Sequence, residues 1–416
     1  MKSNRRELLS GLGGLALMGA TSRLTALPSA AVGPPRTTVG LPVKDDFSVP
    51  SDVTFLNSAY THPLPNCGLK AAHAYAEARS EPGAVMTPLS THDIKADFAA
   101  LINAKESEIS YVPNTSTGEN LVVNGLGIPQ SGRNVVTDAL HFDGALLHLQ
   151  ALRKFRGLDL RIVPARNWRI DLRDLERVVD KNTCLIEISL VAMHNGFQHD
   201  LKAICDLAHS HGALVYADIV QAVGNTPIDV RATNVDFCAC SSFKWLMGDF
   251  GLGFLYVKES LLEKVIHRTQ YGYYEAEKLE SHFLPGDPVG PFPYSWELAS
   301  TAGGHFEAGT PALGVARILS ETLPYIRRLG PENILAHRQP LLKRLHEEMP
   351  RLGFQALTPP ESTSALISFT VKDAPSIRAR LEKAKINVRV ADQYIRISPS
   401  VFNDMKDIDR LLETLS

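Results

Sequence analysis

The sequence has few cysteines, no clustered histidines and no excess of basic residues. Its five cysteines among 416 residues include no Cys-x-x-Cys pair, so the spacing of zinc sites and thioredoxin-like redox motifs is missing. The fourteen histidines are scattered along the chain, which argues against a metal site. Lys and Arg number 43 against 45 Asp and Glu, so no basic surplus indicates nucleic acid or a membrane surface as a partner.

The sequence also has no apolar run long enough for a membrane-spanning helix. Its most apolar stretch near the start, Leu8 to Ala20, is too short to cross a bilayer. Basic residues precede this stretch and small residues follow it, which predicts a signal peptide over residues 1–31. The Arg5-Arg6 pair resembles the twin-arginine export signal of bacteria. We therefore expect a periplasmic protein that meets the twin-arginine translocase during export; a plain Sec signal and a disordered basic tail are the alternatives.

The order of predicted elements indicates an α/β protein with two domains. A chain of this length exceeds what one hydrophobic core usually serves. From Glu108 onward short β-rich runs alternate with helical patterns, which predicts a mostly parallel, seven-stranded sheet between helices. The predicted strands are 109–112, 134–137, 160–163, 184–191, 213–217, 237–240 and 254–257. We expect an N-terminal arm over 32–50, a large domain over 51–309 and a small α+β domain over 310–416.

Two residues of opposite charge follow strands of this predicted sheet. Asp218 ends one strand, and Lys244 comes four residues after Cys240, which ends the next. Ligands bind outside the carboxyl ends of strands in open α/β sheets, so these side chains can converge on one ligand. Pyridoxal phosphate chemistry needs such a pair: an amine that forms a Schiff base and a carboxylate that keeps the pyridine nitrogen protonated. Taken singly, Asp218 could be a helix cap and Lys244 a solvated surface residue.

A longer motif is more specific. The run Asp218-x-x-Gln221, Ser241-x-x-Lys244 and Gly251-x-Gly253 resembles the class V aminotransferases, which are pyridoxal 5′-phosphate enzymes of fold type I. The resemblance extends over nearly the whole chain after the predicted signal. It implies that Lys244 carries the cofactor as a Schiff base and that Asp218 pairs with the ring nitrogen. It further implies that Gln221 bonds the ring hydroxyl and that Ser241 binds the phosphate.

The same resemblance assigns four further residues around the cofactor. Thr115 and Ser116 stand in a turn between a strand and a helix, where the family holds the phosphate; a plain N-cap is the alternative. His141 occupies the place of the ring stacked on the pyridine, although a lone His is more often a satisfied polar residue. Thr310 matches a turn that reaches the phosphate of the neighbouring subunit, which implies a homodimer with shared active sites.

Two residues are predicted to bind the substrate. Arg396 lies in the stretch Tyr394 to Pro399, which resembles the segment whose Arg binds the substrate carboxylate through two parallel hydrogen bonds. Asn57 belongs to the segment Phe55 to Ala59, where the resemblance begins. A surface Arg on a strand is the alternative interpretation of Arg396.

The reaction is predicted from departures within the family. No Cys follows Cys240, and a cysteine desulfurase needs a thiolate near the substrate sulfur, so we do not expect that activity. Met193 stands where the family usually has Asn, a change similar to the isopenicillin-N epimerase-like branch. We expect an aminotransferase that acts on an amino acid or an amino group of a secreted metabolite. An epimerase or α,β-lyase is the alternative, and a periplasmic binding protein without catalysis a more distant one.

Overall fold

The computed structural model describes residues 40–81, 91–281 and 294–416. The predicted signal peptide, 1–31, and the start of the predicted arm lie outside these ranges. A short 3-10 turn, η1 (Lys44–Asp46), opens the described part of the arm. Among the described residues, no helix is long and apolar enough to cross a membrane.

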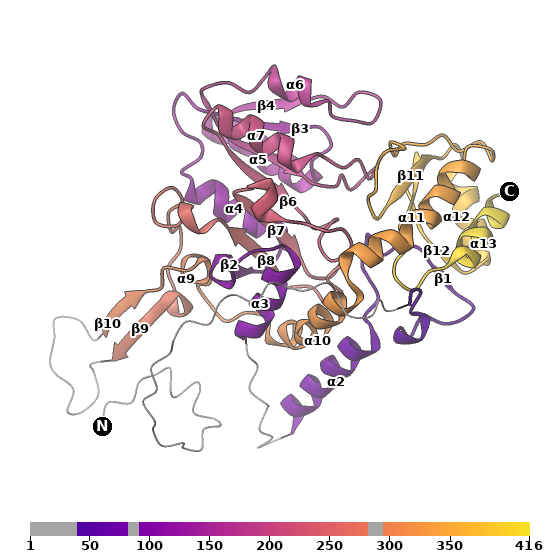
Figure 1. Cartoon of the computed structure of the whole chain (residues 1–416), viewed down its shortest axis with the longest axis horizontal. Coiled ribbons are helices and arrows are strands. Elements are labelled where there is room, and N and C mark those ends of the chain that lie inside the picture. The colour runs from indigo at the N-terminus through magenta and orange to yellow at the C-terminus, as the bar shows by residue number, and fades with distance from the viewer. Residues whose placement is uncertain (1–39, 82–90, 282–293) are drawn as a thin grey trace.

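A seven-stranded sheet forms the centre of the large unit (Figure 1). In spatial order its strands are β2 (Ile109–Val112), β8 (Gly253–Val257), β7 (Phe237–Ser241), β6 (Leu214–Asp218), β5 (Thr183–Ser189), β3 (Asn134–Asp138) and β4 (Asp159–Val163). The pairs from β7 to β4 are parallel, and β8 alone runs against its two neighbours. The predicted fold type I architecture is confirmed.

Side chains on the two faces of the sheet belong to two different hydrophobic clusters. Val215 and Ala217 of β6 join the larger one, whereas Tyr216 between them joins the second, because successive side chains of a strand alternate between faces. Helices pack over both faces, so the strands are buried along their length. The helices of this unit are α4 (Thr115–Gly125), α5 (Asp143–Arg156), α6 (Leu172–Glu176), α7 (Leu201–Ser210), α8 (Val230–Thr233) and α9 (Ala302–Phe306).

Two helices before the sheet were not expected from the sequence. They are α2 (Asn66–Ser80) and α3 (Thr91–Leu101), and both pack against the long helix α10 (Leu313–Leu329). Val315 to Leu329 of α10 contribute to the same hydrophobic cluster as the sheet. The first cluster therefore extends beyond residue 309, where we placed the end of the large domain.

The C-terminal unit has its own hydrophobic cluster, which begins at Leu341 and also takes in Leu56. Its helices are α11 (Pro331–Glu348), α12 (Ala374–Lys383) and α13 (Met405–Leu415). Strand β14 (Tyr394–Ile397) lies between β11 (Ile367–Thr370) and β13 (Arg389–Val390), antiparallel to both. The short strands β1 (Thr54–Phe55) and β12 (Ile386–Asn387) pair in parallel, so the start of the described chain is tied to this unit.

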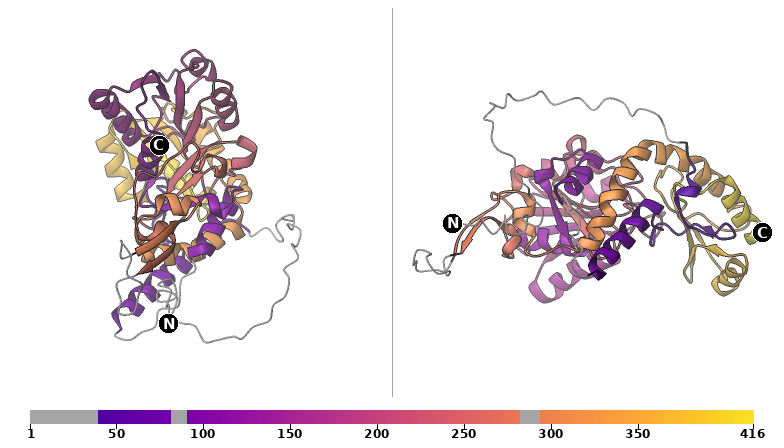
Figure 2. Two further views of the ribbon diagram at one scale, coloured as in Figure 1. Left: turned by 90° about the vertical axis from the view of Figure 1, so that its left-hand side faces the viewer. Right: turned by 90° about the horizontal axis from the view of Figure 1, so that it is seen from below.

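An antiparallel hairpin of β9 (Ala276–Ser281) and β10 (Tyr294–Leu298) projects from the large unit. Figures 1 and 2 show it at the opposite end of the molecule from the C-terminal unit. Residues 282–293, which join the two strands, lie outside the described ranges. The remaining elements are the 3-10 turns η2 (Glu106–Glu108), η3 (Glu259–Leu261) and η4 (Tyr273–Glu275).

Candidate active site

The register of the sheet brings the predicted catalytic residues to one edge. Asp218, the last residue of β6, lies directly beside Ser189 of β5 and Ala239 of β7. Strand β7 ends at Ser241, and the turn that follows carries Lys244. Because these strands are parallel, their carboxyl ends meet at the same edge of the sheet.

Asp218 and Lys244 interact electrostatically in a poorly solvated place. Burial raises the pKa of Asp218 to about 6, although a hydrogen bond from Val220 N (2.8 Å) and the charge of Lys244 act in the opposite direction. Burial also lowers the pKa of Lys244 to about 8; the charge of Arg396 adds to this effect and Asp218 opposes it. The lowered pKa increases the fraction of neutral amine near physiological pH, and the neutral amine is the form that can attack a carbonyl carbon.

His141 is held under the same edge by Ser189. Its ring is 1% exposed, and Nδ1 lies 2.9 Å from Ser189 Oγ. Nε2 is buried without a hydrogen-bond partner, and burial lowers the pKa of the ring, which favours neutral imidazole. The Ser189 hydroxyl also hydrogen-bonds Asp218 and lowers its pKa. The sequence argument did not assign Ser189 a role, although it lies four residues before Met193, whose departure from the family pattern we noted.

Two hydroxyls meet at the N-terminus of α4, one from that helix and one from the end of β7. Thr115, the first residue of α4, donates its backbone N–H to Ser241 Oγ at 3.1 Å, and the two hydroxyl oxygens lie 3.0 Å apart. Asn114 caps the helix through Thr117 N, and Ser116 follows Thr115 in the first turn, half-buried. Free N–H groups and the helix dipole favour an anion such as phosphate at this position.

Gln221 is fixed by contacts at both ends of its amide. Nε2 donates to the carbonyl oxygen of Ala59 at 3.1 Å, and Oε1 accepts from Trp245 Nε1 at 2.9 Å. Since the amide nitrogen has two N–H groups, one remains for a ring hydroxyl. Trp245, which orients Gln221, is a further residue of the site that the sequence argument missed; its position next to Lys244 was the available signal.

Arg396 reaches the site from the C-terminal unit. It lies in β14, is 2% exposed and donates from Nη1 to the carbonyl oxygen of Met193 at 2.9 Å, while Nε has no partner. Asn57 lies beside the end of this strand through a bridge to Ser398, and its Oδ1 is buried without a partner. Thr310, by contrast, is exposed just before α10, and its predicted role concerns a second subunit.

The residues present fit pyridoxal phosphate. The buried Nε2 of His141 has no partner, and the paired hydroxyls of Thr115 and Ser241 suit a phosphate. Lys244 supplies a buried amine that interacts electrostatically with Asp218 and Arg396. A metal does not fit in the same way: among the described residues, no group of three or more His, Cys, Asp or Glu side chains could hold an ion. The fold and this site define a pyridoxal phosphate enzyme.

Comparison with known proteins agrees with this class. The family model described as aminotransferase class-V matches residues 55–411, so the chain belongs to that family and its cofactor is pyridoxal phosphate. A probable cysteine desulfurase of Methanothermobacter thermautotrophicus is 28% identical over 340 residues, 80% of this chain and 81% of the relative.

Solved structures share the fold. The apo cysteine desulfurase of Thermococcus onnurineus NA1 has a TM-score of 0.77 and 24% identity, covering 91% of this chain and 98% of that one. A lysine-to-alanine mutant of C-DES, with glycine covalently linked to its pyridoxal phosphate, has a TM-score of 0.74 and 22% identity, covering 90% and 99%.

Proposed function

We propose that this chain is a pyridoxal phosphate-dependent lyase that removes a β-substituent from an amino acid by α,β-elimination. Membership of the class V family supports the cofactor chemistry. The choice of a lyase is supported by relatives named cysteine desulfurases, which break a carbon–sulfur bond. These relatives favour the α,β-lyase alternative over the transamination that we expected from the sequence.

The cysteines support elimination without a thiolate nucleophile. All five are free; Cys184, Cys205, Cys238 and Cys240 are buried, and only Cys67 is half-buried. Burial raises the pKa of the Cys67 and Cys240 thiols, which keeps them in the poorly nucleophilic protonated form. Residues after Cys240 include no further cysteine. A reaction in which the β-substituent leaves with its bonding electrons needs no such nucleophile.

The single observation that carries the proposal is a buried Lys244 amine whose pKa is lowered to about 8 and which interacts electrostatically with Asp218 and Arg396. Bound pyridoxal phosphate supplies an electron sink for charge that develops at the substrate Cα. Arg396 binds the α-carboxylate, and the Lys244 amine accepts the Cα proton. The electron pair left at Cα forms the Cα–Cβ double bond, and the β-substituent leaves with the electrons of its own bond. Water then releases pyruvate and ammonia, so the balance is substrate plus water to pyruvate, ammonium and the protonated leaving group.

One assay separates the candidate reactions. The purified holoenzyme is incubated with β-chloro-L-alanine, and pyruvate, ammonia and chloride are measured, with Lys244→Ala as the inactive control. Elimination predicts all three products in equal amounts. Two parallel incubations test the other reactions. With L-alanine, transamination would give continued pyruvate formation only with an amino acceptor and without free ammonia. With L-cysteine, desulfuration would give L-alanine. Deuterium uptake at Cα without product release would favour the epimerase-like alternative, and the lyase proposal would then be wrong.

Two further expectations join this proposal. Export is supported by the signal-peptide pattern of residues 1–31, and the twin-arginine route by the Arg5-Arg6 pair. Arg5→Lys combined with Arg6→Lys should leave the protein in the cytoplasm of the producing bacterium. A homodimer with shared active sites is supported by the exposed position of Thr310, and light scattering of the holoenzyme should give twice the mass of one chain. A substrate that is a secreted metabolite would follow from export.

A further inference from the structure

We propose that Arg389 binds a second anionic group of the substrate, so that the enzyme acts on amino acids whose side chain carries a negative charge. The inference rests on the proposed function and specifies its substrate class. Arg396 takes the α-carboxylate in this scheme, and Arg389 takes the group on the side chain.

Strand pairing places the two arginines side by side. Arg389 of β13 is the direct partner of Arg396 of β14 in an antiparallel pair, and directly opposed residues point to the same face of a sheet. Arg389 contributes to the lowering of the Arg396 pKa to about 10, after the larger effect of burial. The two positive charges therefore lie close enough to act on one ligand. Opposed Cα atoms are about 5 Å apart, which is comparable with the span from a carboxylate to a charged β-substituent.

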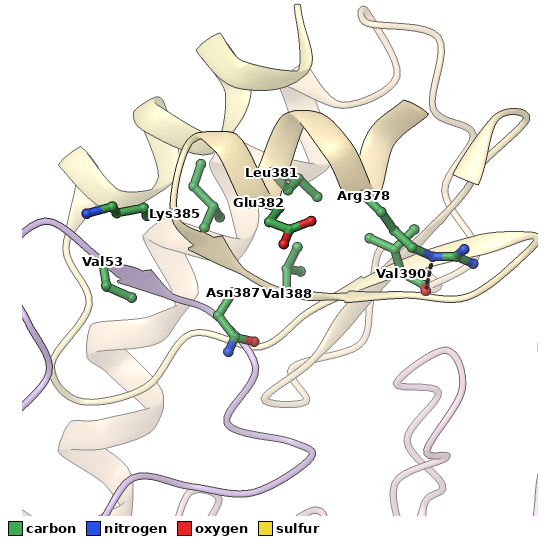
Figure 3. A pocket seen from close by; sticks show the side chains of 9 residues that line it. Val53, Arg378, Leu381, Glu382, Lys385, Asn387, Val388 and Val390 are labelled. Atoms are coloured by element: carbon green, nitrogen blue, oxygen red, sulfur yellow. Dashed lines mark hydrogen bonds between the residues drawn. The ribbon is translucent and has the colours of Figure 1, made fainter. Parts of the chain in front are cut away.

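The opposite face of β13 confirms the direction of Arg389. Figure 3 shows Val388 and Val390, its two neighbours, pointing toward α12 in a cavity of about 450 Å³. Because side chains alternate along a strand, Arg389 points away from that cavity and toward the face that carries Arg396. Arg378 lies on the cavity side, where it donates to Val390 O at 3.2 Å and to Asp392 at 2.8 Å.

Arg389 is available for a ligand. Among the described residues, the structure gives it no carboxylate partner: Nε contacts the hydroxyl of Tyr394 at 3.5 Å, and the guanidinium lies 6.0 Å from the ring centre of Tyr60. The nearby carboxylates are engaged elsewhere, since Asp392 pairs with Arg378 and Asp143 lies 2.9 Å from His194 Nε2. A guanidinium that lies beside an aromatic ring and donates to no carboxylate suits an anionic ligand.

The Tyr394 hydroxyl completes a small polar cluster. His194 Nδ1 lies 3.4 Å from this hydroxyl, and Arg389 Nε lies 3.5 Å from it. An anion bound to Arg389 would therefore also be within reach of a hydroxyl that is already oriented. Arg389 and Tyr394 belong to the C-terminal unit, whereas His194 and the cofactor residues belong to the large unit. The second anion would therefore be held at the junction of the two units.

The test compares two substrates of the elimination that differ in side-chain charge. L-serine O-sulfate has a second negative charge and β-chloro-L-alanine has none. Wild-type holoenzyme should have a lower KM for the sulfate ester. Arg389→Gln should raise that KM about 10- to 100-fold, since a charge-assisted hydrogen bond is lost, and should change the KM for β-chloro-L-alanine less than about two-fold. Arg389→Lys should restore part of the preference, and the matched control Arg378→Gln, on the cavity face, should leave it intact.

A binding measurement separates this inference from the proposed function. Titration of the bound cofactor's absorbance with L-aspartate and L-alanine needs no elimination. If neither test substrate yields pyruvate, the lyase proposal fails, yet a preference for L-aspartate that is lost in Arg389→Gln still supports the role of Arg389. Equal affinity for both amino acids in wild type, or a preference that survives in Arg389→Gln, would overturn it. Circular dichroism and cofactor content of each variant must match those of wild type. If Arg389→Gln fails this check, Arg389→Lys is used in its place. A retained preference of Arg389→Lys for the charged substrate with a raised KM supports the role, and kinetic constants unchanged from wild type contradict it.

Discussion

Ser189 Oγ lies 2.9 Å from Nδ1 of His141 and links that ring to Asp218. The same oxygen accepts the backbone N–H of Phe142 at 3.1 Å. When the Ser189 hydroxyl donates to Asp218, its oxygen is left to accept from Nδ1–H of neutral His141, and the lone pair of the ring is then on Nε2. One serine therefore contacts both the His141 ring and the Asp218 carboxylate.

Ser189→Ala should therefore weaken both groups at once. Loss of the hydroxyl leaves the Phe142 N–H and His141 Nδ1 without their partner, and Asp218 loses one hydrogen bond. We expect kcat to fall roughly 10- to 100-fold, the scale associated with a misoriented catalytic group, with little change in KM. Steady-state kinetics check this, and Ser189→Thr, which keeps a hydroxyl, should recover most of the rate. A Ser189→Ala enzyme with unchanged kcat would show that the link has no catalytic part.

The lowered pKa of Lys244 predicts how the apoenzyme takes up its cofactor. Only the neutral amine attacks the aldehyde of pyridoxal phosphate. With the pKa of Lys244 at about 8 instead of its ordinary 10.5, the rate of Schiff-base formation should rise with pH and level off above about pH 8. Stopped-flow absorbance across pH 6 to 10 measures this. A rate that keeps rising to pH 10 would mean that burial does not depress the pKa, and Lys244→Ala should show no covalent phase.

The hydroxyls of Thr115 and Ser241 should act as one phosphate-binding unit. Thr115→Val or Ser241→Ala removes one hydrogen-bond donor to the phosphate, which should weaken binding of pyridoxal phosphate about 10-fold. Binding of pyridoxal, which lacks the phosphate, should change little. Because the two hydroxyls lie 3.0 Å apart, their effects should not add in the double variant. Equilibrium dialysis with both compounds tests this, and equal losses for both would place the phosphate elsewhere.

Sequence patterns predicted the sheet because its strands are buried, β-rich and separated by helices. They missed α2, where only Gly68 and Ala71 are buried, so its packing against α10 leaves no clear apolar stripe. In the site, the positions of Asp218 and Lys244 could be predicted because one ends a strand and the other closely follows the next. Ser189 and Arg389 could not, since their roles depend on cross-strand register and on contacts between distant segments, which no local pattern records. Trp245 had one local signal, its position next to Lys244.

Glu187 gives a prediction about stability. It lies in the middle of β5, is fully buried, and neither carboxyl oxygen has a hydrogen-bond partner. Burial, with a smaller contribution from the charge of Glu119, raises its pKa well above the ordinary value of 4.5. The folded protein therefore keeps this proton at a pH where the unfolded chain has lost it. Below about pH 4.5 both states are protonated and the residue has no pH-dependent effect.

Above that pH the unfolded state binds fewer protons than the folded state, so stability falls by up to about 1.4 kcal/mol per pH unit until the folded pKa is reached. Glu187→Gln has no ionisable proton and removes this slope. It should be more stable than wild type at pH 7.5 and nearly equal to it at pH 4.5, as measured by urea unfolding of holoenzyme at both values. The exposed Glu176→Gln should show no such difference. If Glu187→Gln changes stability equally at both pH values, Glu187 does not hold its proton in the folded protein.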